Sequence, residues 1–132
     1  MRKEIKLDTA HRAQFLDITR QILEYLREIG AQNGAVTVFV PHTTSAVTVN
    51  ENADPSVVSD LIRTLEKLIP HTGDYRHAEG NSDAHLKSSL LGCSQQLLVE
   101  NGELCLGTWQ GVYFCEFDGP RSRKIWLSFI PA

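Results

Sequence analysis

The C-terminal third of the chain constrains the fold most, because it consists of short alternating segments separated by tight turns. Residues 96–100 and 103–106 flank Asn101-Gly102, the pair most typical of a two-residue hairpin turn. Two further segments of this kind follow, at residues 112–117 and 124–130. Since tight turns connect antiparallel neighbours, this region predicts an antiparallel sheet.

Helices are predicted where apolar residues recur at helical spacing. The first runs from an Asp17 cap to about residue 29. The second begins at Asp54-Pro55, a cap followed by a residue suited to the first helical position, and ends near residue 69. A third, short helix is expected from about Asp83 to Gly92. The residues expected to face inward are Ile18, Ile22, Tyr25, Leu26 and Ile29 in the first helix and Val58, Leu61, Ile62, Leu65 and Ile69 in the second.

Extended structure is predicted at residues 3–7, 35–40 and 45–49, whereas residues 71–82 have no period and are predicted to form a loop. A loop of that length in a compact domain is usually functional or disordered. Strands and helices do not alternate as βαβ units, so their order predicts one α+β domain, residues 1–132, with a mostly antiparallel sheet.

The composition excludes several classes of protein. The 132 residues carry 13 basic and 16 acidic side chains, a net charge of −3, which does not suit a nucleic-acid-binding surface. No segment resembles a signal peptide or a membrane span. The cysteines Cys93, Cys105 and Cys115 are odd in number and lack C-x-x-C spacing, so we expect reduced thiols, the last two buried, in a cytoplasmic protein.

Polar side chains gather in three segments, each of which lies where an apolar pattern stops. The densest is residues 77–85, with two imidazoles, two carboxylates and one carboxamide. Residues 41–55 and 107–111 form the others. Burying such groups without partners is costly, so the segments are either solvated or face a ligand. Loops held by rigid elements are the usual place for a site.

Three histidines are candidate metal ligands: His42, His77 and His85. Three protein ligands with water in the fourth position form an open zinc site. The alternative is that they are surface or hydrogen-bonding histidines. His77-Ala78-Glu79 also matches the H-x-E of zinc nucleobase deaminases, but the P-C-x-x-C segment that such a site needs is missing, so that function is excluded.

Carboxylates in these segments are candidates for general acid–base catalysis or cation binding, namely Glu79, Asp83 and Glu51. Asp83 is equally suited to cap the short helix, and Asp54 is better explained as a cap than as a catalyst. Glu116 lies in a strand-like segment, where we expect it to point outward without a role.

Candidate substrate-binding groups suggest a phosphate. The start of a helix near Asp83 would present free N–H groups to an anion, and Arg121 or Arg123 would reach a phosphate bidentately, unless they are only solvated turn residues. Trp109 would stack on a ring or make a core or subunit contact. The predicted substrate-binding residues are Thr43, Thr44, Asn50, Asn81, Ser82, Thr108, Gln110 and Arg121.

The sequence resembles the YjbQ family, also called the secondary thiamine-phosphate synthase family, in three segments. These read HTTSAVTVNENADP, YRHAEGNSDAHLKSSLLG and VENGELCLGTWQGVYFCEFDGPRSRK, and the resemblance extends from about Phe15 to Ile130. It implies a mixed, mostly antiparallel β-sandwich flanked by two longer helices and one short helix, assembled as a homotrimer. It also implies a thiamine-phosphate synthase activity, which joins hydroxymethylpyrimidine pyrophosphate to thiazole phosphate.

We therefore expect a small cytoplasmic enzyme that acts on phosphorylated heteroaromatic metabolites, with a divalent metal ion, zinc or magnesium, as cofactor. Dedicated thiamine-phosphate synthases use a (β/α)₈ barrel, for which 132 residues are too few. Any synthase activity of this chain therefore rests on another fold. The alternatives are a metal-dependent hydrolase with Glu79 as base, and a trimeric module that binds metabolite or metal without turnover.

Overall fold

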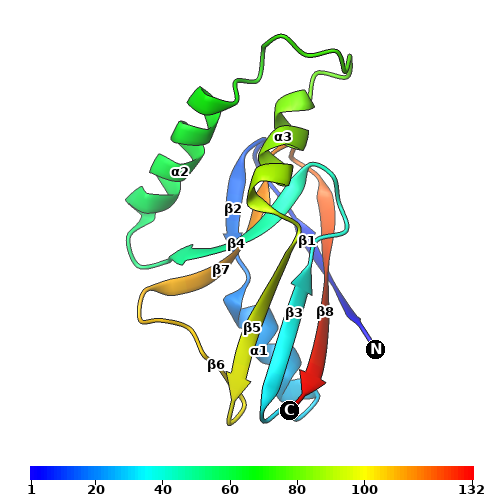
Figure 1. The fold of residues 1–132 in the computed structure, drawn as a ribbon, viewed down its shortest axis with the longest axis vertical. Helices are drawn as coiled ribbons and strands as arrows, with labels where there is room; N and C mark the ends of the chain where they lie inside the picture. The colour runs from blue at the N-terminus through cyan, green and yellow to red at the C-terminus, as the bar shows by residue number, and fades with distance from the viewer.

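The structure is a computed structural model that describes all residues from Met1 to Ala132, and it contains eight strands and three helices (Figure 1). In chain order the elements are β1 (Lys3–Asp8), β2 (Gln14–Asp17), α1 (Thr19–Glu28), β3 (Gly34–Phe39), β4 (Ser45–Glu51), α2 (Pro55–Leu68), α3 (Ser82–Leu91), β5 (Ser94–Glu100), β6 (Glu103–Leu104), β7 (Gln110–Glu116) and β8 (Ser122–Pro131).

The strands form two sheets, one of five strands in the order β1-β8-β3-β5-β6 and one of three in the order β2-β7-β4. Every paired neighbour is antiparallel, which confirms the predicted α+β class. Two longer helices and one short helix were expected, but α2 alone is long, with 14 residues, and α1 and α3 have 10 each. None of the three is long and apolar enough to span a membrane.

The main core lies between the two sheets. Period-two alternation places Val36, Val38, Ile125 and Leu127 of the five-stranded sheet in one apolar cluster with Val47 and Phe114 of the three-stranded sheet. Helix α1 closes this core with Ile22, Tyr25 and Leu26. Ile29, expected to face inward, is 47% exposed because the helix ends before it.

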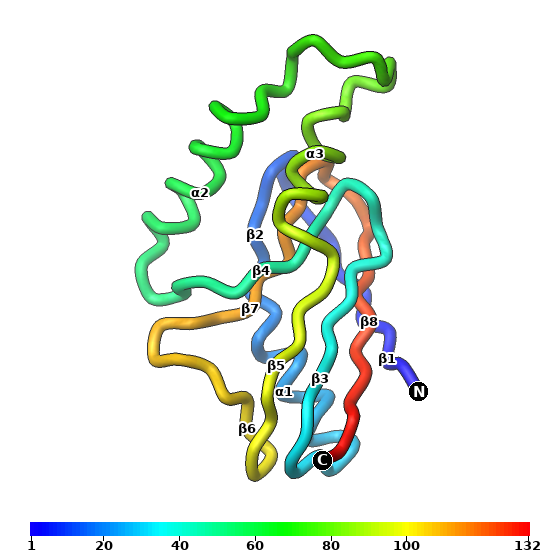
Figure 2. Tube along the Cα trace, viewed as in Figure 1, coloured from blue at the N-terminus to red at the C-terminus, as the bar shows by residue number.

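The opposite face of the three-stranded sheet packs on the other two helices. Ala46, Tyr113 and Cys115 form a smaller cluster there with Leu65 of α2 and Ala84 of α3. Leu65 is the only buried residue of α2, which lies at the side of the molecule in Figures 1 and 2. The other residues predicted to face inward from α2 are only partly buried.

Local signals in the sequence predicted several boundaries. Asp54 caps α2, since its Oδ1 accepts from the Ser56 N–H at 2.9 Å. Asn101 and Gly102 both have positive φ, 51° and 76°, as a type I′ hairpin turn requires. The loop between α2 and α3 also occurs where expected.

The structure also differs from the sequence-based expectations at β2 and at Cys105. Strand β2 was not predicted, because it has only four residues and leads almost directly into α1. Cys105 is exposed rather than buried, since β6 ends at Leu104 and leaves the thiol outside the sheet.

Candidate functional site

A buried ion pair closes one end of the main core. Arg123 lies on the inward face of β8, and Glu116 lies on the inward face of β7. The pair therefore joins the two sheets. Arg123 Nε donates to Glu116 Oε1 at 2.8 Å, and Arg123 Nη2 donates to Oε2. The Thr9 hydroxyl also donates to Oε1, at 2.8 Å. The expectation that Glu116 points outward was therefore wrong.

Burial alone would raise the pKa of Glu116, but the hydrogen bonds from Arg123, the Asp118 N–H and Thr9 hold it below its ordinary value. The carboxylate is thus fixed in its charged form. Its negative charge in turn holds the Arg123 guanidinium in one orientation.

Arg123 uses only part of its donor capacity in this pair. Nη2 also donates to Thr44 Oγ1 at 2.8 Å, whereas Nη1 has no partner within the chain. The side chain is only 5% exposed, yet Arg123 lines a surface cavity. A rigid cation with an unused Nη1 group therefore forms part of the wall of this cavity.

The cavity, which we call the polar cleft, has a volume of about 420 Å³. Figure 2 shows how three segments meet at this end of the molecule: the β3–β4 turn, the β7–β8 turn and the start of α3. No lining residue is hydrophobic. The lining residues are Pro41, His42, Thr43, Thr44, Glu79, Asn81, His85, Asp118, Arg121 and Arg123.

His42 is held in one tautomer at the wall of the polar cleft. Its Nε2 accepts a hydrogen bond from the Lys124 backbone N–H at 3.0 Å. In a neutral imidazole the other nitrogen, Nδ1, then carries the proton. Burial and the nearby Arg123 charge lower the pKa of His42, so the neutral form is favoured. The ring therefore offers a donor, Nδ1–H, rather than a free lone pair.

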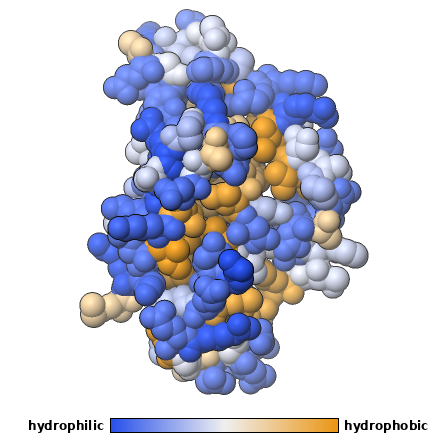
Figure 3. Space-filling view, turned by 180° about the vertical axis from the view of Figure 1, so that it is seen from behind, coloured by the Kyte–Doolittle hydropathy of each residue, from blue (hydrophilic) through white to orange (hydrophobic).

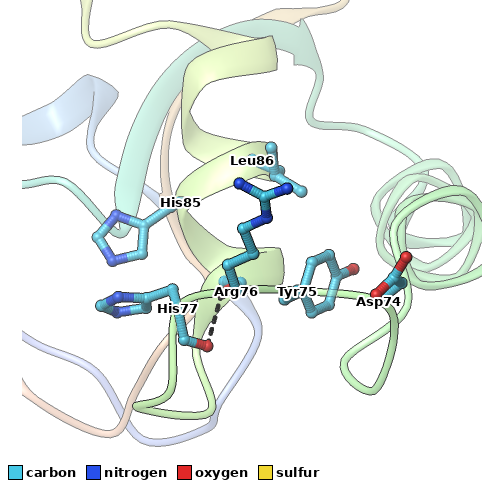
Figure 4. A pocket seen from close by; sticks show the side chains of 7 residues that line it. Asp74, Tyr75, Arg76, His77, His85 and Leu86 are labelled. Carbon is cyan, nitrogen blue, oxygen red and sulfur yellow. Dashed lines mark hydrogen bonds between the residues drawn. The ribbon is translucent and has the colours of Figure 1, made fainter.

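His77 and His85 lie together, as expected, with their rings edge to face at a centroid distance of 5.2 Å (Figure 4). His77 Nε2 bonds to Asn81 Oδ1 at 3.1 Å and lies 3.8 Å from Glu79 Oε2. The backbone N–H of His85 donates to the Asn81 carbonyl at 3.3 Å, whereas its imidazole makes no hydrogen bond within the chain. His85 lines three cavities: the polar cleft and two neighbours.

These three histidines do not form a metal site as arranged here. No group of three or more His, Cys, Asp or Glu side chains is positioned to hold a metal ion. His42 would have to release the Lys124 N–H before Nε2 could act as a ligand. Metal binding by His77 and His85 stays a prediction.

Asn81 ties the candidate loop to the β7–β8 turn instead of capping α3. Its Nδ2 donates to Asp118 Oδ2 at 2.8 Å, and Asp118 also accepts from Arg121 Nη2 at 2.9 Å. The Ser82 hydroxyl bonds the His77 carbonyl at 3.4 Å. The N–H groups of Ala84 and His85 donate to the Asn81 carbonyl, and since no side chain caps α3, those of Ser82 and Asp83 remain without a partner next to Asn81 in the cleft wall.

Asp83 lies away from the cleft in a buried charge network. It accepts from Arg12 Nη2 at 2.9 Å and from Lys87 Nζ at 2.8 Å, and Lys87 also donates to Glu66. Burial would raise the pKa of Asp83, but the bonds from Arg12 and Lys87 lower it to about 2. The helix begins at Ser82, so Asp83 is not its cap. These contacts favour a structural role over proton transfer.

The remaining candidates form a second cluster at the far end of β4 and β7. Glu51 pairs with Gln110 in the ladder, whereas Ser45 pairs with Glu116 beside the polar cleft. The strand advances about 20 Å between Ser45 and Glu51. Within one chain, therefore, the second cluster cannot contact a ligand in the cleft. Its candidate members are Asn50, Glu51, Thr108 and Gln110.

The sequence contained one usable signal for the residues that were missed. Period-two alternation places Glu116 in phase with Phe114, and Arg123 in phase with Ile125. This phase is compatible with a buried pair of opposite charges, but β7 is buried on both faces, so phase alone does not place Glu116 in the main core. Asp118 carries no such signal, because it lies within the turn itself.

Comparisons with known proteins agree on one family. Residues 3–132 match the family described as UPF0047 protein YjbQ-like. The UPF0047 protein YugU of Bacillus subtilis is 48% identical over 132 residues, which cover 98% of this chain and 99% of that protein. The UPF0047 protein YjbQ of Escherichia coli O157:H7 is 39% identical over 103 residues, 75% of each chain.

Solved structures agree with this assignment. A protein of the YjbQ/UPF0047 family from Clostridium acetobutylicum is 52% identical and superposes with a TM-score of 0.95, covering 97% of this chain and 99% of that one. A YbjQ-like protein of unknown function from Sulfolobus solfataricus is 29% identical, also with a TM-score of 0.95, covering 100% and 97%. These names state no activity. The chain belongs to the YjbQ (UPF0047) family.

Proposed function

We propose that the polar cleft binds the phosphate of a small phosphorylated metabolite. The observation that carries this proposal is Arg123, a buried guanidinium that lines the cleft and whose Nη1 has no partner within the chain. Arginine held in a fixed orientation suits phosphate oxygens, because its N–H groups match their geometry.

Further donors surround the same space. His42 presents Nδ1–H, and the exposed Thr43 adds a hydroxyl. Arg121 brings a second guanidinium, about half exposed, and the uncapped start of α3 adds backbone N–H groups. A phosphate at the start of a helix is stabilised by these N–H groups and by the helix dipole.

Two carboxylates in the cleft suit a divalent cation bound together with the phosphate. Glu79 is 75% exposed and makes no close ion pair, while Asp118 is already engaged by Arg121 and Asn81. Magnesium is typically held by one or two carboxylates together with substrate phosphates, and it keeps several waters. Glu79 is therefore the residue of this chain that we assign to such a cation.

A neighbouring cavity of about 520 Å³ suits the ring of a heteroaromatic substrate. Tyr75, Arg76 and Leu86 line it together with His77 and His85 (Figure 4). Aromatic, guanidinium and apolar groups of this kind pack on planar rings. Because His85 lines both this cavity and the cleft, a ring here would lie beside the phosphate.

The reaction we propose is displacement of pyrophosphate, as in thiamine-phosphate synthesis. The thiazole nitrogen forms a bond to the pyrimidine methylene carbon as the carbon–oxygen bond to pyrophosphate breaks, and the electron pair leaves with pyrophosphate. The protein needs only to orient both rings and stabilise the departing charge, for which Arg123 and the start of α3 are suited. Binding without turnover is the alternative.

We also propose that the chain assembles as a homotrimer. Large apolar side chains remain exposed, among them Leu68, Leu90, Leu98, Trp109 and Ile130. Figure 3 shows apolar surface gathered in the middle of one face. Such surface commonly marks a subunit contact. Light scattering should give about three times the 14.8 kDa chain mass, and a monomer at all concentrations would contradict it.

Calorimetric titration with pyrophosphate, with and without magnesium, tests the proposed function. Arg121→Gln should weaken binding about tenfold, since a charge-assisted hydrogen bond is lost. Arg20→Gln is the matched control, because Arg20 lies on the surface of α1 and is 84% exposed. The proposal fails if pyrophosphate does not bind at millimolar concentration, or if both variants bind like the parent.

Glu79→Gln separates the cation from the phosphate. Magnesium should strengthen pyrophosphate binding by the parent but not by Glu79→Gln, because the amide carries no charge to attract the cation. Equal magnesium dependence in the two proteins would remove Glu79 from the site. The synthase reaction is tested by incubating both substrates and measuring the pyrophosphate released.

A further inference from the structure

Two buried hydroxyls without partners lie in a cavity next to the polar cleft. Ser45 begins β4 and is 1% exposed, and Ser88 lies in α3 and is 7% exposed. Neither Oγ atom has a hydrogen-bond partner. Ser88 does not bond back to the preceding helical turn, as serines in helices often do. A buried hydroxyl left unpaired destabilises the fold, so both atoms call for an explanation.

Both serines line the same space, a cavity of about 430 Å³ that we call the serine pocket. Thr43 and Ser89 add two more hydroxyls to its wall. His42, Thr43 and His85 line the polar cleft as well, so the two cavities share a wall. A molecule with its phosphate in the cleft would reach the serine pocket with its next few atoms.

The serine pocket differs from the cleft in charge. No arginine, lysine or carboxylate lines it. His42 is neutral there, for the reasons given above, and presents Nδ1–H. A carboxylate or ammonium group of the ligand would lose its water without gaining an opposite charge. Hydroxyls of the protein both donate and accept, so they match groups that do the same.

We infer that the serine pocket binds the hydroxyls of an uncharged, polyhydroxylated group, and that the ligand of the phosphate site is accordingly a sugar phosphate or a metabolite that contains one, rather than the two thiamine precursors, which carry no such group. This inference rests on the proposed phosphate site. It goes further by naming the kind of group that is bonded to the phosphate in the ligand. The Oγ atoms of Ser45 and Ser88 are buried and unpaired here, so each side chain would rotate about χ1 to bond these hydroxyls.

The test compares two phosphate esters by calorimetry, ribose 5-phosphate and methyl phosphate, which lacks hydroxyls. The parent should bind ribose 5-phosphate more tightly. Ser45→Ala and Ser88→Ala should each weaken ribose 5-phosphate binding by about tenfold while methyl phosphate binding changes less than about twofold. Ser59→Ala, on the exposed surface of α2, is the matched control and should bind both esters like the parent.

Thermal unfolding of the same variants guards against a purely structural effect. Because each alanine removes an unpaired buried hydroxyl, neither substitution should lower the Tm. Equal affinity of the parent for the two esters, or unchanged ribose 5-phosphate binding in both variants, overturns the inference and leaves the phosphate site intact. Failure of the parent to bind either ester overturns the proposed function as well.

Discussion

Arg123 of β8 and Glu116 of β7 form a buried ion pair, with Nε and Oε1 2.8 Å apart, that joins the two sheets at the edge of the polar cleft. The pair has two consequences. It fixes the orientation of a guanidinium that lines the cleft, and it makes the stability of this end of the core depend on one carboxylate.

Glu116→Gln should therefore destabilise the fold by about 3 kcal/mol, because it leaves Arg123 buried without an opposite charge. Urea unfolding at fixed protein concentration measures the loss. Glu24→Gln is the control, since Glu24 pairs with Arg20 on the exposed surface of α1 and should cost less than about 0.5 kcal/mol. Similar, small losses in both variants would mean that the pair does not hold the sheets together.

Asp83 should make stability depend on acid pH. Its folded pKa, about 2, lies below the ordinary value of 3.8, so its contribution is complete above about pH 5 and is lost progressively as the pH falls through 2 toward about 1. The contribution is about 2 kcal/mol. Asp83→Asn should therefore be less stable than the parent at pH 7, and the difference should shrink as the pH falls from about 5 to 2. A constant difference between pH 7 and pH 2 would contradict this assignment.

His42 should stay neutral to a lower pH than an ordinary histidine, whose pKa is 6.5. The pKa of His42 is lower in the folded protein than in the unfolded chain. The unfolded chain binds the proton more readily, and stability falls as the pH drops below 6.5. Nitrogen-15 NMR of the imidazoles should show His42 with its proton on Nδ1 at neutral pH. A proton on Nε2 would mean that the bond from Lys124 is absent.

Metal binding by the candidate loop is tested by elemental analysis of protein purified without a histidine tag. If His77 and His85 bind zinc, as the sequence predicts, His77→Ala and His85→Ala should each lose it, and His11→Ala should keep it. Because His42 Nε2 is occupied by the Lys124 N–H, His42→Ala should retain the metal. Full zinc content in both loop variants would exclude these two histidines as ligands.

Most of the fold could be predicted from local patterns. The Asn101-Gly102 turn and the Asp54 cap each act through a few neighbouring residues, so the sequence alone indicates them. The Glu116–Arg123 pair could not be placed in this way, because a charged residue in an alternating segment is usually on the solvent side. Only the packing of the two sheets makes that position an inward one.

The candidate site was predicted in part for a similar reason. Residues 41–45 and 77–85 do meet at the polar cleft. Glu51 and Gln110 belong to equally polar segments, but the register of β4 against β7 carries them about 20 Å away. Polarity marks which segments are candidates, whereas strand direction decides which of them share a cavity.

The central claim is that phosphate binds beside Arg123 in the polar cleft. Backbone amide NMR during a titration with methyl phosphate tests it most directly, because each amide reports its own surroundings. If phosphate binds there, we expect saturable shifts at residues 42–44, 82–85 and 121–124, and none at Glu51 or Gln110. Absence of saturable shifts, or shifts centred on another part of the molecule, would contradict it.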